Sequence, residues 1–208
     1  MINIPIWTIS YFSELIKKGV DIGIDNFVIH PSGEPIEETE SAERMECAKE
    51  SLAELAEIAA RSGATIAVED LPRTCLGRNS AEILELISVH PALRVCFDTN
   101  HLLSEDIPIF IRNVGSKIIT LHVSDYDFLN ERHWLPGEGD INWSDVLAAL
   151  QEVGYAGPWL YEVGYSSPAT IERRILSAQD FVDNAQMIFA GEKPEAIGLR
   201  KPDLKFWK

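Results

Sequence analysis

Four side chains with the chemistry of metal ligands each end a short apolar run in this sequence: Glu69, Asp98, His122 and Glu162. In a barrel of alternating strands and helices, the carboxyl ends of the strands converge on one rim, where active sites lie. Three carboxylates and one imidazole that meet there suit a divalent cation with hard to borderline ligand preferences. Each residue alone has an ordinary alternative, such as a solvated turn carboxylate or a hydrogen-bonded core histidine. Four such residues at successive strand ends favour a metal site.

The segments that must position these residues alternate between strand and helix patterns. Apolar residues at three-four spacing between Met45 and Ala59 indicate a helix with one buried face. The strand-like runs are apolar on both faces, as is typical of parallel strands covered by helices. The pattern predicts strands over residues 26–30, 64–69, 93–98, 117–122 and 158–162, and helices over residues 10–18, 40–61, 79–89, 107–114 and 143–153, with a long final helix that starts at Ser167 and Pro168.

The sequence therefore predicts an α/β fold, a TIM-type (β/α) barrel that is shortened at its N-terminus to about five parallel strands. A closed barrel of this type has eight strands and about 250 residues. Residues 1–25 show one helix pattern and no further strand pattern. We expect residues 1–190 to form the incomplete barrel domain and residues 191–208 to form an irregular C-terminal extension. Exposed strand edges invite pairing, so a homo-oligomer that covers the open edge is favoured.

Composition narrows the class of protein further. The chain has 208 residues, enough for one domain with a proper core, and a formal net charge of −15. This acidic balance argues against a nucleic-acid partner, since nucleic-acid-binding proteins usually present a basic face. Cys47, Cys75 and Cys96 are an odd, widely spaced set, which indicates reduced thiols in a cytoplasmic protein, with Cys96 as a small core residue in a strand. No apolar run reaches membrane-spanning length, and residues 1–10 do not resemble a signal peptide.

Further polar residues follow the same strands. His30 ends the first strand pattern, and His101 stands three residues after the second of the four ligand candidates, so that both can approach the same centre. Arg132 and His133 lie in a long loop before the helix at residue 143. Arg73 lies in the loop after residue 69, and Arg73 and Arg132 are the candidates for binding a substrate phosphate.

Six short motifs in a fixed order carry a family resemblance. They are IHP at 29–31, VEDLP at 68–72, FDTNH at 97–101, LHVSD at 121–125, PGEGDI at 136–141 and YE at 161–162. Each motif is weak alone, but their order and spacing together are specific. The sequence from about residue 24 to about residue 190 resembles the sugar phosphate isomerase/epimerase superfamily, the xylose isomerase-like barrels that also include apurinic endonuclease IV.

The resemblance implies roles for the residues that match the motifs. Glu69, Asp98, His122 and Glu162 would bind one divalent ion, commonly manganese, magnesium, cobalt or zinc. Glu69 and Glu162 would also face the substrate carbon from opposite sides as acid and base. The first three strands of the family have no counterpart in this sequence, and they precede every expected ligand. The residues that would bind substrate are His30, His101, Arg132 and His133.

The predicted reaction is isomerisation or epimerisation of a ketose or sugar phosphate. A divalent ion bound by the carbonyl and hydroxyl oxygens of the substrate acidifies the C–H bond between them and stabilises the enediolate. Paired glutamates then accept and return the proton. One alternative is a metal-dependent phosphodiesterase of the apurinic endonuclease IV type, which His30, His101, Glu131 and His133 support and the net charge disfavours. The other is a non-catalytic metal-binding relative, which would not turn over ketoses.

Overall fold

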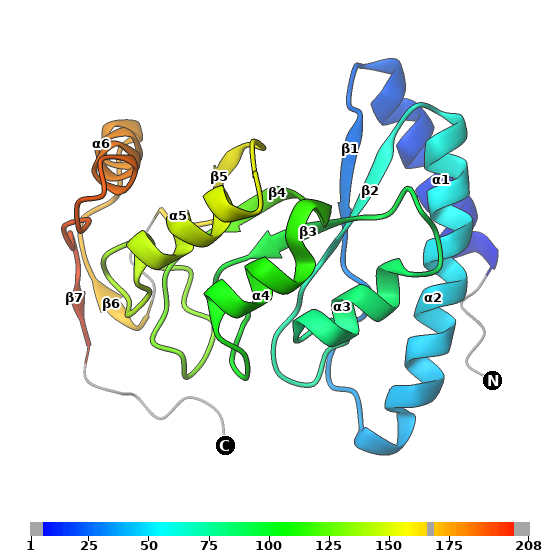
Figure 1. The fold of residues 1–208 in the computed structure, drawn as a ribbon, viewed down its shortest axis with the longest axis horizontal. Helices are drawn as coiled ribbons and strands as arrows, with labels where there is room; N and C mark the ends of the chain where they lie inside the picture. Colours follow the sequence, from blue (N-terminus) through cyan, green and yellow to red (C-terminus); the bar gives the residue numbers. More distant parts are fainter. Residues whose placement is uncertain (1–5, 166–168, 202–208) are drawn as a thin grey trace.

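The computed structural model describes residues 6–165 and 169–201. Its main sheet has five parallel strands in the order β1-β2-β3-β4-β5. The strands turn progressively from β1 to β5, with α1 and α2 at one end of the molecule and α6, β6 and β7 at the other (Figure 1). The elements of the sheet and its helices are α1 (Ile6–Asp21), β1 (Asn26–Ile29), α2 (Glu38–Arg61), β2 (Thr65–Glu69), α3 (Ser80–Ile87), β3 (Arg94–Asp98), α4 (Ile107–Val114), a 3-10 turn (Gly115–Lys117), β4 (Ile118–Val123), α5 (Trp143–Glu152) and β5 (Trp159–Tyr161). The predicted fold class, an open section of a TIM-type barrel, is confirmed.

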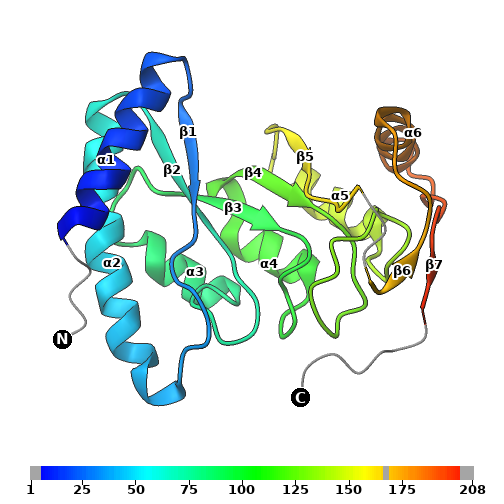
Figure 2. The same ribbon diagram turned by 180° about the vertical axis from the view of Figure 1, so that it is seen from behind.

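One face of this sheet packs against the helices. Val68, Phe97 and Leu121 are fully buried and belong to one hydrophobic core together with apolar residues of α2, α3, α4 and α5. Successive side chains of a strand point to opposite faces, so the next residues along β2, β3 and β4 point away from this core. These next residues are Glu69, Asp98 and His122. Three of the candidate ligands therefore share the sheet face that lies opposite the helices. Figure 2 shows the ribbon of this sheet and its helices from behind.

Within the described residues, β1 and β5 each pair with a single strand, so that both edges of this sheet are open. Val28 of β1 and Leu160 of β5 are 41% and 47% exposed. The register pairs Leu160 with His122, so that its side chain points to the face that carries the candidate ligands. The prediction that the strands are covered on both faces is wrong for β5, because it is an edge strand in the described sheet and the Glu162 side chain that follows it is 47% exposed. In a closed barrel, side chains from the opposite strands would fill this inner face.

The C-terminal part of the chain departs most from the prediction. The last helix, α6 (Ala178–Phe189), begins after Ser177, which forms a capping box with Asp180. The predicted start at Ser167 and Pro168 falls outside the described residues. Before and after α6, the short strands β6 (Ile171–Glu172) and β7 (Leu199–Arg200) pair antiparallel with each other. The tail that was expected to be irregular after residue 190 thus contains a strand.

The remaining elements lie close to their predicted bounds. Helix α3 begins after Asn79, whose side chain accepts a hydrogen bond from the Glu82 N–H at 2.9 Å. The N-terminal helix extends beyond the predicted residues 10–18 at both ends. None of the helices in the described part of the chain combines the length and the apolar character that crossing a bilayer requires.

Candidate metal centre

Glu69, Asp98, His122 and Glu162 come together at the carboxyl ends of β2 to β5. Each of the four offers one ligand atom that lies within 4.8 Å of the others. His122 Nδ1 is 2.9 Å from Glu69 Oε1 and 2.9 Å from Glu162 Oε2. The parallel register explains this arrangement, because it places Asp98 beside His122 and extends β5 towards Glu162, whose N–H donates to the Val123 carbonyl. The structure therefore gathers the four residues at one point.

Burial and hydrogen bonding set the protonation of the two inner carboxylates. Glu69 is 2% and Asp98 0% exposed. Burial acts to raise the pKa of Glu69, but hydrogen bonds from His122 and His30 outweigh it and lower this pKa to about 2. Burial raises the pKa of Asp98 to about 7 against the opposing charge of His101. Asp98 Oδ2 accepts no hydrogen bond from the described residues, and such a buried oxygen is costly unless a cation binds it.

The His122 ring occupies the middle of this cluster. Hydrogen bonds with Cys96, Glu162 and Glu69 raise its pKa, and the hydrogen bond from His122 in turn lowers the pKa of Glu162. A protonated ring therefore holds two carboxylates together. A divalent cation can take over this role, since metal ions displace protons from ligands that stand together. Three carboxylates and one imidazole form a mixed oxygen and nitrogen donor set that fits manganese, cobalt or zinc.

A second cluster adjoins the first. His101, Glu131 and His133 each offer a ligand atom within 4.8 Å of the others. His101 Nε2 is 3.0 Å from Glu131 Oε1 and 3.6 Å from Asp98 Oδ2, so that this ring joins the two clusters. Burial acts to lower the pKa of His101, but the Asp98 charge and the hydrogen bond with Glu131 raise it to about 10. His101 is thus held as a cation between carboxylates.

His30 and Arg73, both predicted to bind substrate, have different surroundings. The His30 side chain is 62% exposed, and its Nε2 is 3.2 Å from Glu69 Oε2. It can therefore contact a ligand at the centre. Arg73 Nε donates to the two carboxylate oxygens of Glu34 at 2.9 and 3.0 Å, and its terminal nitrogens pair with Glu34 and Glu131. The Arg73 guanidinium is therefore already neutralised.

Arg132 and His133 lie in the loop that crosses the rim. The Arg132 guanidinium pairs with Asp127 at 2.7 Å and lies 5.6 Å from the ring centre of Trp134. Asn100, fully buried, accepts hydrogen bonds from the N–H groups of Arg132 and His133 at 2.9 and 3.4 Å. Asn100 stands in the FDTNH motif but was not among the predicted site residues. It fixes the loop against the strand end that carries the ligand cluster.

Backbone strain coincides with two of these residues. Arg73 and His133 adopt φ angles of 54° and 50°, in the left-handed region that non-glycine residues rarely occupy. Such conformations cost about 1 kcal/mol or more and persist where the surrounding structure fixes them. They gather at ligand-binding sites, so their occurrence here supports a functional rim around both clusters.

A further buried carboxylate, Asp125, follows β4 but has every oxygen satisfied. Its Oδ1 accepts from the N–H groups of Tyr126 and Ile141 at 2.9 and 3.1 Å. Its Oδ2 accepts from the Gly137 N–H at 2.8 Å and from Trp143 Nε1 at 3.1 Å. These bonds fold the loop back on the end of β4. Asp125 is therefore a structural residue.

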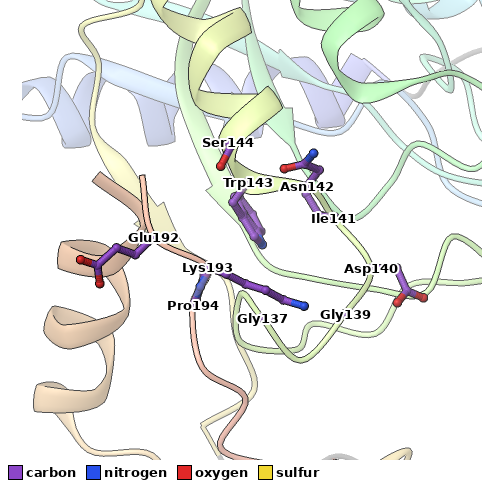
Figure 3. A pocket seen from close by; sticks show the side chains of 10 residues that line it. All are labelled: Gly137, Gly139, Asp140, Ile141, Asn142, Trp143, Ser144, Glu192, Lys193 and Pro194. Atoms are coloured by element: carbon purple, nitrogen blue, oxygen red, sulfur yellow. The ribbon is translucent and has the colours of Figure 1, made fainter. Parts of the chain in front are cut away.

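A cavity of about 320 Å³ lies beside that loop, at the start of α5. In Figure 3 the side chains of Trp143 and Lys193 extend into the space between this helix and the segment after α6. Gly137 is required here, because its φ is +96° and a Cβ would meet the Pro194 carbonyl oxygen at 2.4 Å. The residues that line this cavity belong to neither ligand cluster, so the cavity is separate from the candidate centre.

Parallel strands that alternate with helices and gather acidic and imidazole side chains at one rim are the arrangement of a (β/α) barrel. A family model described as xylose isomerase-like TIM barrel matches residues 6–185. The chain therefore belongs to this family.

Solved structures of similar fold include several sugar epimerases. A D-tagatose 3-epimerase-like protein is 26% identical, with a TM-score of 0.69 over 77% of this chain and 64% of that chain. The D-psicose 3-epimerase of Clostridium cellulolyticum H10, solved with D-tagatose, is 24% identical, with a TM-score of 0.65 over 78% of this chain and 58% of that chain. The second likeness is one of fold.

Two relatives with curated sequences extend the comparison. An uncharacterized protein of Methanocaldococcus jannaschii is 28% identical over 159 residues, which are 72% of this chain and 54% of the relative. The fructoselysine 3-epimerase of Escherichia coli O157:H7 is 25% identical over 114 residues, which are 52% of this chain and 42% of the relative. The chain thus spans about half the length of the curated relatives it matches.

Proposed function

We propose that this chain acts as a divalent-metal-dependent epimerase or isomerase of a ketose. One observation carries the proposal: Glu69 and Glu162 meet at a single nitrogen of His122, beside the unsatisfied Asp98 Oδ2. This is a centre that a cation would complete. The family membership and the epimerases of similar fold support the same class of reaction.

In this proposal Glu69, Asp98, His122 and Glu162 hold the ion. When bound, the ion would act as a Lewis acid that polarises the substrate carbonyl and stabilises the enediolate. Glu69 comes from β2 and Glu162 follows β5, at the two ends of the row of strands that carries the four residues. One of them would remove a proton from the substrate carbon and the other would return a proton to it. Glu162 is 47% exposed and can exchange its proton with water, whereas Glu69 is buried.

We infer that the substrate carries no phosphate. The two arginines at the rim already pair with carboxylates, Arg73 with Glu34 and Arg132 with Asp127. A phosphate dianion would also meet the negative field of the ligand carboxylates, which repels it. A neutral polyol with a carbonyl group meets neither obstacle.

The open edges of the sheet make a second copy of the chain the proposed partner. Strands β1 and β5 leave backbone groups unpaired within the described sheet, and Val28 and Leu160 are exposed on its inner face. Such edges pair readily with other strands. A solution mass of twice the chain mass or more would support this assembly, and a monomer at working concentration would reject it.

The first test is the metal content of the purified protein by elemental analysis, followed by a panel of simple ketoses. We expect about one divalent ion per chain, because the proposed reaction uses a single Lewis-acid centre. We also expect epimerisation of at least one free ketose. Glu69→Ala should lose both the ion and the turnover. The matched control is Glu54→Ala, which removes an exposed carboxylate on α2 and should keep both. Retention of ion and turnover by Glu69→Ala would reject the site.

A second candidate function is metal-dependent phosphodiester hydrolysis. The cluster of His101, Glu131 and His133 favours it, because this group could hold a further ion beside the first. Phosphodiester cleavage often uses two or more metal ions. Two or three zinc ions per chain, with cleavage of DNA that contains abasic sites, would establish this function in place of the first. Ion binding without turnover of either substrate class would identify a non-catalytic relative.

A further inference from the structure

Cys96 lies directly under the candidate centre. Its side chain is fully buried on β3, where the register pairs it with Glu69 on one side and Thr120 on the other. Cys96 and Asp98 are two residues apart on one strand, so both point to the inner face, with Cys96 deeper below the rim. Glu69, Cys96 and His122 each offer one ligand atom within 4.8 Å of the others.

We call Glu69, Cys96 and His122 the sulfur group, and Glu69, Asp98, His122 and Glu162 the carboxylate group. The two groups share Glu69 and His122. The carboxylate group is completed by Asp98 and Glu162 towards the rim, whereas the sulfur group is completed by Cys96 towards the sheet. Cys96 was predicted to be a small core residue, yet its sulfur lies within 4.8 Å of ligand atoms of Glu69 and His122. A thiol that only fills the core would face apolar side chains.

We propose that the centre offers two alternative ion positions. The outer position uses Glu69, Asp98, His122 and Glu162, and the inner position uses Glu69, His122 and the Cys96 sulfur. The inference rests on the proposed function, in that it takes the divalent-metal centre as given. A thiolate is a soft ligand that favours Zn²⁺ and Co²⁺, whereas an oxygen-rich set suits Mg²⁺ and Mn²⁺. The identity of the ion therefore decides which position is filled.

Binding at the inner position requires that the Cys96 thiol lose its proton. The ion forms a bond to the Cys96 sulfur as the thiol proton leaves to solvent, so that one proton is released for each thiol bound. The ion reaches this position past His122, whose side chain is 22% exposed. Zinc-loaded protein then keeps Asp98 and Glu162 out of the ligand set, while manganese-loaded protein uses them.

The test is the absorption spectrum of the full chain after removal of bound metal and titration with Co²⁺. We expect a sulfur-to-cobalt charge-transfer band in the near ultraviolet for the unaltered chain. Cys96→Ser should lose this band and still bind Co²⁺ through the carboxylates. Cys47→Ser is the matched control, since Cys47 lies on α2 outside both ligand groups, and it should keep the band. Competition titrations should show the preference for Zn²⁺ over Mn²⁺ falling about tenfold or more in Cys96→Ser, because a ligand of the inner position is lost and even loss of a partner next to a ligand costs about 10–100-fold.

The outcomes separate this inference from the proposed function. Co²⁺ bound without a sulfur band in the unaltered chain would overturn the inner position and leave the epimerase proposal intact. An unchanged preference for Zn²⁺ in Cys96→Ser would do the same. No uptake of Co²⁺, Zn²⁺ or Mn²⁺ by the unaltered chain would overturn both. If Cys96→Ser fails to fold, Cys96→Ala replaces it, and the spectrum of the unaltered chain decides in either case.

Discussion

Two aspartates at neighbouring strand ends are equally buried but differ in how many hydrogen bonds their oxygens accept. Asp98 ends β3 and Asp125 follows β4, and both are 0% exposed. Asp125 receives four hydrogen bonds, two on each oxygen. Asp98 Oδ1 accepts from the Asn100 N–H at 2.7 Å, while its Oδ2 accepts none from the described residues. Burial raises the pKa of both, so burial does not distinguish them; hydrogen-bond satisfaction does.

Two buried glutamates differ in the same way. Glu138 pairs with Arg173 at 2.6 Å, both side chains are 0% exposed, and the Gly198 N–H donates to Glu138 at 2.9 Å. Glu69 instead pairs with His30 and His122, whose rings are themselves ligands for metals. The oxygens of a carboxylate that accepts hydrogen bonds from amide and guanidinium groups are not available to a cation. A carboxylate that is hydrogen-bonded to imidazoles can bind a metal ion, because the ion can displace the imidazole protons.

The largest expected loss of stability follows substitution of Asp125, the aspartate that receives four hydrogen bonds. Asp125→Asn places an amide NH₂ where one carboxylate oxygen accepted two donors, so at least two buried N–H groups lose their partner. Each such loss costs about 1–3 kcal/mol, which gives a total of about 2–6 kcal/mol. The free energy of unfolding, measured by urea denaturation of the metal-free protein, checks this value.

The control for this substitution is Asp145→Asn, an exposed residue in the first turn of α5. It should change the stability by less than about 1 kcal/mol. If Asp125→Asn also changes the stability by less than about 1 kcal/mol, the four hydrogen bonds do not hold the loop. Asp125 and Asp98 would then not differ in their contribution to stability.

Asp98→Asn should weaken metal binding strongly and change the stability of the metal-free protein little, the opposite of Asp125→Asn. It removes a ligand charge, and we expect the affinity for Mn²⁺ or Zn²⁺ to fall at least about a hundredfold, the upper end of what loss of an outer partner costs. The stability of the metal-free protein should change by less than about 1 kcal/mol, because the amide keeps the bond from Asn100 and the burial penalty that it removes offsets the lost attraction between Asp98 and His101. Calorimetric titration and urea denaturation of one preparation measure both quantities. A large stability loss with unchanged metal affinity would make Asp98 structural.

The strand ends were predictable from sequence because local signals coincide there. Each apolar run stops at a charged residue, and parallel topology brings these ends to one rim. The face of each ligand was not predictable from the spacing alone. It follows from the register that places Val68, Phe97 and Leu121 in the core beneath the helices.

Residues that act through long-range contacts gave weak or ambiguous signals. Asn100 contacts a loop more than thirty positions later in the chain, at Arg132 and His133. Cys96 has the composition of an ordinary core residue, and its neighbours Glu69 and His122 come from two other strands. Strands β6 and β7 are two residues each and pair across α6, so neither has a period that a sequence pattern could show.

The smallest effect concerns the link between the two clusters, the pair of His101 and Glu131. Burial acts to raise the pKa of Glu131 from its ordinary 4.5, but hydrogen bonds from His101 and Arg73 lower it to about 2. This contribution to stability is present above pH 4.5 and is lost as the pH falls towards 2. The pKa of His101 is raised from 6.5 to about 10, so its contribution is present below pH 6.5 and is lost as the pH rises towards 10.

Glu131→Gln should therefore reduce the stability of the metal-free protein most between pH 4.5 and 6.5, where both groups are charged in the folded and largely in the unfolded chain. We expect about 1.5–3 kcal/mol there, the range for a hydrogen bond to a charged group, and less at about pH 3 or pH 9.5. Urea denaturation at these three pH values, with Glu54→Gln as the exposed control, measures the profile. A loss that is the same at all three would mean that Glu131 supports the rim by packing, and that His101 is held by Asp98, Glu69 and the Asp70 carbonyl.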